Sequence, residues 1–263
     1  MEIYRWLIYG NIWIALGACS FTYSTSFILY GRIDVKVLVI VFFATLIGYN
    51  YQRYISVTSQ NNSNVKDDWF LSKINLIKAM GYLLIPLCLY LCLVTFNINE
   101  AVWFLPFTFI IICYRWPVLG LALRDLPYLK IFIISLTWGF ITVLLVQFSE
   151  HDLNLNWMLI LNNSLYILGI TIPFDIRDLD TDSSSKKTIP QIVGVKIAVS
   201  LSIICLLISA LMYYNIGFSW FSGVCIISAI VTLFSISKRQ DWYYSFIIDG
   251  LLLLFPLFTI FKA

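Results

Sequence analysis

Residues 155–182 read LNWMLILNNSLYILGITIPFDIRDLDTD, an apolar run that ends in a cluster of acidic residues. The run over 155–174 has the length of roughly 20 residues that a helix needs to cross the hydrocarbon core of a bilayer. The end of the stretch carries four carboxylates in eight positions, those of Asp175, Asp178, Asp180 and Asp182. Holding these charges together at a membrane boundary is costly unless a positive group binds there. The stretch therefore predicts a membrane helix that ends in a cation-binding loop.

The whole chain has the composition of a membrane protein. Of its 263 residues, 60% are hydrophobic and 12% are charged, whereas soluble domains carry charge on about a quarter of their residues. This composition excludes a soluble globular protein. The apolar stretches lack the two-residue alternation of outer-membrane barrels, so we predict helices. Nine such stretches can be drawn, at 6–29, 35–57, 75–96, 100–114, 128–148, 155–174, 191–213, 216–236 and 243–261.

We therefore expect an all-α integral membrane protein with nine transmembrane helices in a single polytopic domain over residues 1–263. Basic residues divide unevenly between the two sides that this topology defines. Fourteen lie on the side of the N-terminus and of the loops after the even-numbered spans, and three, Arg32, Lys36 and Lys262, lie on the other. Cytoplasmic loops carry such an excess. We place the N-terminus and the acidic loop in the cytoplasm, and expect the inner (cytoplasmic) membrane of a bacterium.

The acidic loop has a spacing that suits a divalent cation. If the helix continued beyond residue 175, Asp175, Asp178 and Asp182 would fall within about 60° of one another, because successive residues are about 100° apart. Mg²⁺ is commonly held by one or two carboxylates and by the phosphates of a substrate. The spacing predicts a Mg²⁺-diphosphate site, to which Lys187 would add a point charge. A solvated acidic loop is the alternative, and for Lys186 we favour contact with lipid headgroups.

One further charge lies inside an apolar span. Asp249 falls within 243–261, between Ile248 and Gly250. A carboxylate inside a membrane is costly and marks a functional position by default. Asp249 would stabilise a carbocation, accept a proton, or pair with an arginine of a neighbouring helix, and the sequence leaves these three roles open.

The motif Asp-x-x-Asp-x-x-x-Asp, followed by Lys187-Thr188-Ile189-Pro190 and Gly194, resembles the second half of the UbiA prenyltransferase superfamily. The loop that holds Tyr114, Arg115, Trp116, Pro117, Val118, Leu119, Arg124, Pro127 and Lys130 is similar to the family pattern as well. The resemblance implies a helical bundle around a central cavity with a cytoplasmic cap. It also implies two Asp-rich motifs that hold Mg²⁺ and a prenyl diphosphate. The allylic carbocation formed there is captured by a lipid-soluble or aromatic acceptor.

The first Asp-rich motif of that family is altered in this chain. It should fall on residues 50–58, where Asn50 is kept but Tyr51, Tyr54 and Thr58 replace the three aspartates. Two repairs are conceivable. Arg53 would supply fixed positive charge in place of one Mg²⁺, its alternative role being to reach the membrane interface. Asp67 and Asp68 would otherwise fold back as ligands, which we consider the weaker repair.

We predict an enzyme that transfers a prenyl group to an acceptor. A terpene cyclase, which ionises the same diphosphate without an acceptor, and a non-catalytic isoprenoid-binding relative are the alternatives. An unrelated transporter would show internal repeats, which the sequence lacks on inspection. No basic patch indicates a nucleic-acid partner, and no heptad pattern indicates an oligomeric state. The expected catalytic residues are Asp175, Asp178, Asp182, Asn50 and Arg53, and the expected substrate-binding residues are Tyr114, Arg124, Lys187 and Asp249.

Overall fold

The computed structural model describes residues 2–32, 34–59, 65–116, 122–182 and 186–258. All regular structure in this part of the chain is helical. The α-helices are α1 (Glu2–Tyr9), α2 (Ile12–Tyr30), α3 (Val35–Ser59), α4 (Val65–Ser72), α5 (Ile74–Thr95), α6 (Ile98–Ala101), α7 (Leu105–Cys113), α8 (Lys130–Ser149), α9 (Trp157–Arg177), α10 (Ile189–Val193), α11 (Val195–Asn215) and α12 (Ser219–Leu233). The short 3-10 helices are η1 (Val102–Phe104), η2 (Leu123–Asp125) and η4 (Phe234–Ile236), and the C-terminal segment contains η5 (Tyr243–Ile248), η6 (Leu251–Leu254) and η7 (Pro256–Phe258).

Seven of the described helices are long and apolar enough to cross a membrane: Ile12–Tyr30, Val35–Thr58, Ile74–Thr95, Lys130–Ser149, Trp157–Arg177, Val195–Asn215 and Ser219–Ile236. Among the described residues, seven full spans thus replace the nine that the sequence predicts. The expected fourth and ninth spans are the shorter apolar helices Ile98–Cys113 and Tyr243–Leu254. Residues 259–261 of the expected ninth span, together with Pro117, Val118, Leu119, Ser183, Ser184 and Ser185 of the two loops, lie outside the described residues.

The first span also begins later than predicted. The chain breaks after α1, and α2 starts at Ile12, because Asn11 adopts a left-handed conformation with φ of 62°. The Asn50 side chain of α3 fixes this break. Its amide nitrogen donates to the Gly10 carbonyl at 3.3 Å, and its oxygen accepts from the Asn11 amide at 3.0 Å. Asparagine tolerates the left-handed region better than most residues, so α1 can turn away from α2.

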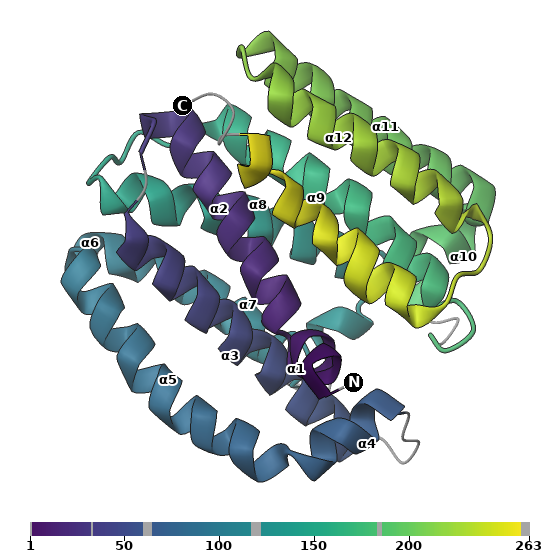
Figure 1. Cartoon of the computed structure of the whole chain (residues 1–263), viewed down its shortest axis with the longest axis horizontal. Helices are drawn as coiled ribbons and strands as arrows, with labels where there is room; N and C mark the ends of the chain where they lie inside the picture. The colour runs from purple at the N-terminus through teal and green to yellow at the C-terminus, as the bar shows by residue number, and fades with distance from the viewer. Residues whose placement is uncertain (1, 33, 60–64, 117–121, 183–185, 259–263) are drawn as a thin grey trace.

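Close approach of small residues positions the central helices. In Figure 1, α5 lies at one edge of the bundle and α11 and α12 at the opposite edge, with α2 between them. A Cβ atom added to Gly139 of α8 would lie 2.0 Å from the Ser164 Oγ of α9, and one added to Gly169 of α9 would lie 2.6 Å from Leu206 of α11. Membrane helices associate through such small residues, and here they bring α8, α9 and α11 into contact.

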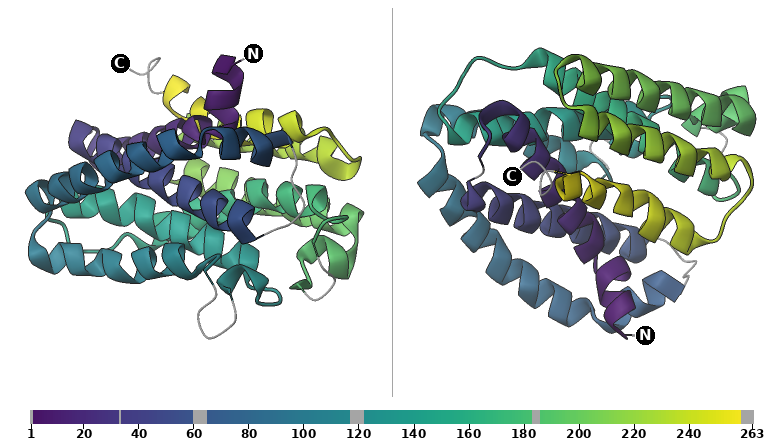
Figure 2. Two further views of the ribbon diagram at one scale, coloured as in Figure 1. Left: turned by 90° about the horizontal axis from the view of Figure 1, so that it is seen from below. Right: turned by 45° about the horizontal axis from the view of Figure 1, so that its top comes forward.

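The described polar loops form two groups at opposite ends of the bundle. At one end, Arg32 pairs with Glu150 and the Tyr30 hydroxyl donates to Asp152 at 3.0 Å. At the other end (Figure 2), α3 contacts α4, α4 contacts the start of the C-terminal segment, and the beginning of α8 contacts the end of α9. This second end contains Asp175, Asp178 and Asp182, and it is the end on which the sequence places most basic residues.

Candidate functional site

The acidic loop does not continue the helix. Helix α9 ends at Arg177, and Asp178 is its C-cap. The carbonyl oxygen of Asp178 then accepts from the backbone N–H groups of Thr181 at 3.0 Å and Asp182 at 2.8 Å, so the chain turns back. The stripe of three carboxylates expected on a continuous helix is therefore absent, because the geometry of successive helical residues applies only as far as Asp175 and Asp178.

Asp175 and Asp182 nevertheless meet, through a lysine of another helix. The Lys130 Nζ at the start of α8 lies 2.7 Å from the Asp175 Oδ1 and 3.1 Å from the Asp182 Oδ2. Asp175 is 2% exposed, and within the described residues its second oxygen, Oδ2, is buried without a hydrogen-bond partner. The Lys186 Nζ lies 2.7 Å from the other oxygen of Asp182. We call Asp175, Lys130, Asp182 and Lys186 the lysine bridge.

The two lysines hold the carboxylate of Asp182 in its charged form. Burial by itself raises the pKa of this group, but the hydrogen bonds and charges of Lys186 and Lys130 outweigh it and bring the pKa below its ordinary value of 3.8. Opposite charges at hydrogen-bond distance favour the ionised form of an acid. Asp182 therefore stays ionised between the ammonium groups of Lys130 and Lys186.

Asp178 faces a different partner. The Arg177 guanidinium donates to it from Nε at 2.7 Å and from Nη2 at 3.1 Å. The same guanidinium lies over the rings of Phe174, at 5.1 Å, and Tyr244, at 5.9 Å. In the part of the chain that the structure describes, no three Asp, Glu, His or Cys side chains are gathered so as to hold a metal ion. The predicted Mg²⁺ triad is thus not assembled, and its members are neutralised by lysine and arginine.

The loop before α8 brings two arginines to this end of the bundle. The Arg124 backbone N–H donates to the carbonyl of buried Tyr114 at 3.0 Å. The Arg124 guanidinium lies 3.8 Å from Asp125 and 4.0 Å from Asp182, and its buried Nε has no hydrogen-bond partner among the described residues. Burial, followed by the charge of Arg124, lowers the pKa of Arg115 to about 10. Arg124 thus lies beside the acidic loop, with Tyr114 bonded to its backbone, and the substrate-binding role of both residues stays a prediction.

Lys187 lies elsewhere. It is exposed and its Nζ lies 5.5 Å from the centre of the Tyr128 ring. Lys186, which we expected at the lipid headgroups, instead contacts Asp182, with Asp125 at 3.7 Å. Sequence alone cannot choose between adjacent lysines in an irregular segment, because no regular period fixes which way each side chain points.

The altered first motif contributes an arginine and no carboxylate of its own. Arg53 of α3 forms an ion pair of 3.2 Å with Asp67 of α4, which is 7% exposed, whereas Asp68 is exposed. The Thr58 hydroxyl donates to the carbonyls of Tyr54 and Ile55 in its own helix. Asn50, as described above, fastens the break between α1 and α2. Of the residues predicted in the first motif, only Arg53 adds a charge to this end of the bundle. Asp67 folds back and pairs with it.

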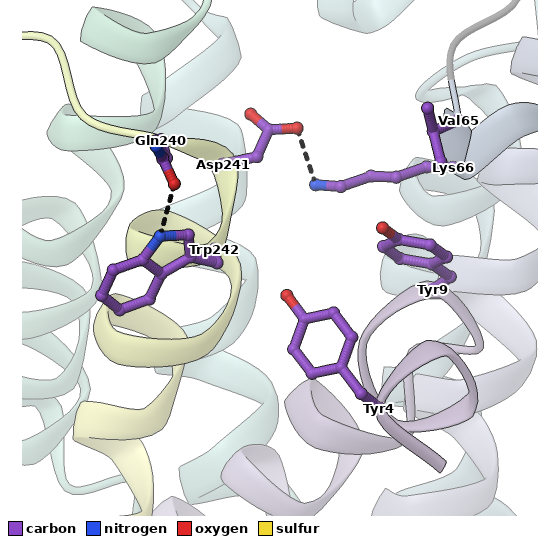
Figure 3. A pocket seen from close by; sticks show the side chains of 7 residues that line it. All are labelled: Tyr4, Tyr9, Val65, Lys66, Gln240, Asp241 and Trp242. Atoms are coloured by element: carbon purple, nitrogen blue, oxygen red, sulfur yellow. Dashed lines mark hydrogen bonds and ion pairs between the residues drawn. The ribbon is translucent and has the colours of Figure 1, made fainter. Parts of the chain in front are cut away.

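A pocket of about 410 Å³ opens between α1, α4 and the start of the C-terminal segment. Figure 3 shows Tyr4 and Tyr9 of α1 and Lys66 of α4 on one side and Asp241 and Trp242 on the other. The Lys66 Nζ lies 3.2 Å from Asp241 and donates to the Ser245 hydroxyl at 3.0 Å. Burial lowers the pKa of Lys66, and the charges of Arg177 and Arg53 lower it further, although Asp241 opposes them.

Asp249 lies in the C-terminal segment one residue after η5. It forms no ion pair with any described residue, and its nearest charged influences are Arg177 and Lys66. Of the three roles that the sequence leaves open, the pairing with an arginine is thus not made as a direct contact.

The structure compares closely with two solved proteins. Over 95% of this chain and 98% of the other, it superposes on a UbiA homologue from Aeropyrum pernix K1 with a TM-score of 0.71 at 13% sequence identity. The chain has the UbiA fold. A digeranylgeranylglyceryl phosphate synthase in membranes shares the UbiA fold over the full length of both chains, with a TM-score of 0.61 at 16% identity. The resemblance expected from residues 110–200 is confirmed for the fold, and these identities establish the fold alone.

No family model and no curated protein matches the sequence. The UbiA fold is therefore visible in the arrangement of the helices and in the short motifs, and not in overall sequence similarity.

Sequence reasoning gave no site role to four residues that the structure brings to this end: Lys66, Arg115, Lys130 and Arg177. A signal existed for Lys130, because a lysine at the first position of an apolar span can reach an acid at the end of the antiparallel neighbour. For Lys66 no signal existed, because its partner Asp241 is far away in the sequence.

Proposed function

We propose that this protein is an intramembrane enzyme of the UbiA type, which binds a prenyl diphosphate at the charged end of the bundle and transfers the prenyl group to an acceptor. The observation that carries the proposal is the buried charged end itself. Within a UbiA fold, Asp175 and Asp182 lie there beside Lys130, Asp182 lies near Arg124, and Asp178 lies beside Arg177. Buried charges at a membrane boundary are expensive and indicate function. We assign this end to the cytoplasmic side, in agreement with the distribution of basic residues.

The reaction requires heterolysis of a carbon–oxygen bond. The electron pair of that bond leaves with the diphosphate, and the allylic cation is captured by the acceptor, which then loses a proton. Guanidinium and ammonium groups near the departing diphosphate stabilise the charge that develops on it. Aromatic faces stabilise the cation, and Phe174 and Tyr244 already lie around one positive group, the guanidinium of Arg177. Tyr114 and Asp249 would contribute to binding at the same end.

The UbiA resemblance implies Mg²⁺ held by Asp175, Asp178 and Asp182. The described arrangement does not fit this ion, because Lys130 bridges two of the carboxylates and Arg177 takes the third. A hard divalent cation needs negatively charged or carbonyl oxygens around it. We therefore assign no step of the reaction to Mg²⁺, and give the counter-charge for the diphosphate to fixed side chains.

Two related functions remain as alternatives. A terpene cyclase would use the same ionisation, with an internal double bond of the prenyl chain in the place of the acceptor. A non-catalytic prenyl diphosphate carrier is favoured by one observation, the use of Asn50 and Thr58 for packing within the bundle. These two positions of the first Asp-rich motif then take no part in the reaction.

Release of diphosphate tests the proposal. The full chain in lipid nanodiscs is given farnesyl or geranylgeranyl diphosphate, with Mg²⁺ and separately with EDTA. Inorganic diphosphate and any hydrocarbon product are measured. We expect release by the wild type and a loss of at least about 100-fold in Asp178→Asn, because Asp178 holds the Arg177 guanidinium by two hydrogen bonds, and a cation that loses its position stabilises the departing diphosphate less. Asp180→Asn is the matched control, because Asp180 lies in the same loop but is exposed and pairs only with Lys238 among the described residues.

The products separate the functions. A cyclic hydrocarbon formed without an acceptor would assign the chain to the cyclases. Binding of the prenyl diphosphate without any turnover, in the presence of candidate quinone or aromatic acceptors, would favour the carrier. Absence of both binding and release would exclude all three.

A further inference from the structure

Three carboxylates that a UbiA protein would offer to a divalent cation are already neutralised in this chain. Lys130 lies between Asp175 and Asp182, at 2.7 and 3.1 Å. Asp178 receives two hydrogen bonds from the neighbouring guanidinium, that of Arg177. A metal ion would have to displace an ammonium group from the first two carboxylates and a guanidinium from the third. Breaking a buried ion pair by removal of one partner is expensive, so such displacement is opposed.

The opposite half of the site offers no replacement ligands. The first-motif positions carry Tyr51, Tyr54 and Thr58. The Tyr54 ring faces the ammonium of Lys78, at 4.9 Å, and the Thr58 hydroxyl is bonded to its own helix. The acid that lies nearest, Asp67, is paired with Arg53 at 3.2 Å. In the UbiA pattern, two clusters of oxygen ligands would face one another across a metal site. This chain has cationic side chains at that place.

Two arginines at this end of the bundle, Arg115 and Arg124, retain hydrogen-bonding capacity. Arg115 forms no ion pair with a described carboxylate, although burial and the charges of Arg124 and Arg53 lower its pKa to about 10. The Arg124 side chain is only 16% exposed, its nearest carboxylate oxygens lie 3.8 and 4.0 Å away, and the Nε donor is buried without a hydrogen-bond partner in the described part of the chain. A guanidinium whose donors are unused in a buried place is suited to bidentate contact with phosphate oxygens.

We infer that this protein holds the diphosphate end of its prenyl ligand with fixed guanidinium groups, those of Arg115 and Arg124, aided by the positive charge of Arg53, and without a divalent metal ion. The inference rests on the proposed function and specifies its chemistry. A phosphate-rich headgroup relieves the mutual repulsion of these arginines. The lysine bridge keeps Asp175 and Asp182 from repelling the same anion.

Binding in the absence of metal tests this inference. The full chain in nanodiscs of zwitterionic lipid is titrated with farnesyl diphosphate, in EDTA and in Mg²⁺, and binding is measured by equilibrium filtration of the labelled ligand. We expect dissociation constants that agree within about threefold in the two buffers. Arg115→Gln and Arg124→Gln should each weaken binding in EDTA by at least about tenfold, which corresponds to about 1.4 kcal/mol. Arg32→Gln, a matched change at the opposite end of the bundle, should leave the affinity unchanged.

The controls separate the two proposals. Binding that appears only with Mg²⁺ would overturn the inference and leave the proposed function in place. Failure to bind in either buffer would overturn the proposed function. Unchanged affinity in both arginine variants would overturn the assignment of the guanidinium groups, provided that each variant melts within a few degrees of the wild type. The variant Arg115→Lys tests whether a positive charge alone is sufficient for binding. Equal affinity for inorganic diphosphate and farnesyl diphosphate would overturn the lipid part of the proposal.

Discussion

At the scale of single residues, the two nitrogen–oxygen contacts of Lys130 connect positions that lie 45 and 52 residues apart in the chain. The contacts join the first residue of α8 to the last turn of α9 and to the loop beyond it. The sequence shows Lys130 only as a lysine at the edge of an apolar span. No pattern in the sequence pairs it with Asp175 or Asp182. The pairing neutralises two carboxylates of the acidic loop, and for this reason we expect the arginines, and not a cation held by the loop, to bind the diphosphate.

Lys130→Met should destabilise the protein by about 3–5 kcal/mol, because it leaves the buried Asp175 carboxylate without its counter-charge. Thermal unfolding in detergent, followed by tryptophan fluorescence, measures the change. Lys196→Met, at an exposed lysine of α11, is the matched control and should change stability little. Asp175→Asn in the Lys130→Met background should restore part of the loss. A Lys130→Met protein as stable as the wild type would contradict the lysine bridge.

The lysine bridge also predicts a pH dependence. Because the pKa of Asp182 is lowered in the folded protein, its ion pairs contribute stability above the ordinary value of 3.8, and this contribution is lost as the pH falls through the lower folded value. Asp182→Asn should therefore lower the free energy of unfolding at pH 7 by about 1–3 kcal/mol. The difference between the two proteins should shrink as the pH falls below 3.8. A difference that is constant with pH would show that Asp182 does not act through its charge.

At the scale of the helices, the contact of α8 with α9 determines whether Lys130 can reach Asp175. This contact depends on Gly139, where a Cβ atom would lie 2.0 Å from the Ser164 Oγ and 2.8 Å from the Ile160 carbonyl oxygen. The serine can rotate but the carbonyl cannot move without the helix. The two helices would have to separate, and their charged ends with them.

Gly139→Ala should therefore destabilise the protein by about 1–3 kcal/mol, the usual cost of overpacking. Gly81→Ala in α5 is the control, because nothing lies within 4 Å of its added Cβ atom and alanine favours a helix over glycine by about 1 kcal/mol. Melting temperatures of the two variants should move in opposite directions. If both variants rise, the close approach of α8 and α9 is not maintained in the membrane.

At the scale of the whole molecule, the charged end of the bundle and the end with Arg32 and Glu150 must lie on opposite sides of the bilayer. From the excess of basic residues we expect the charged end to lie in the cytoplasm. Arg32→Cys should therefore react with a membrane-impermeant maleimide in intact cells, and Asp180→Cys only after permeabilisation. Both positions are exposed, with 70% and 73% of their side chains accessible. The wild type gives the background from its own six cysteines. The reverse labelling pattern would invert the topology.

The sequence by itself determined the class of protein, because about 20 consecutive apolar residues have few stable environments other than a bilayer. It also singled out Asp175, Asp178, Asp182, Tyr114 and Arg124 as candidate site residues, since short motifs need no knowledge of distant residues, and their roles stay predictions. Seven of nine spans met the length of a membrane helix, and the breaks at Asn11 and within the C-terminal segment shortened the expected limits of the first and last spans.

Only the tertiary structure decided which charges neutralise one another. Lys130 with Asp175, Arg53 with Asp67 and Lys66 with Asp241 are pairs between separate helices or segments. Helical period relates neighbours within one element, whereas the distance between two elements depends on how closely their surfaces pack. The small residues at Gly139 and Gly169 set those distances here. The acidic motif was therefore readable from the sequence, but its partner was not.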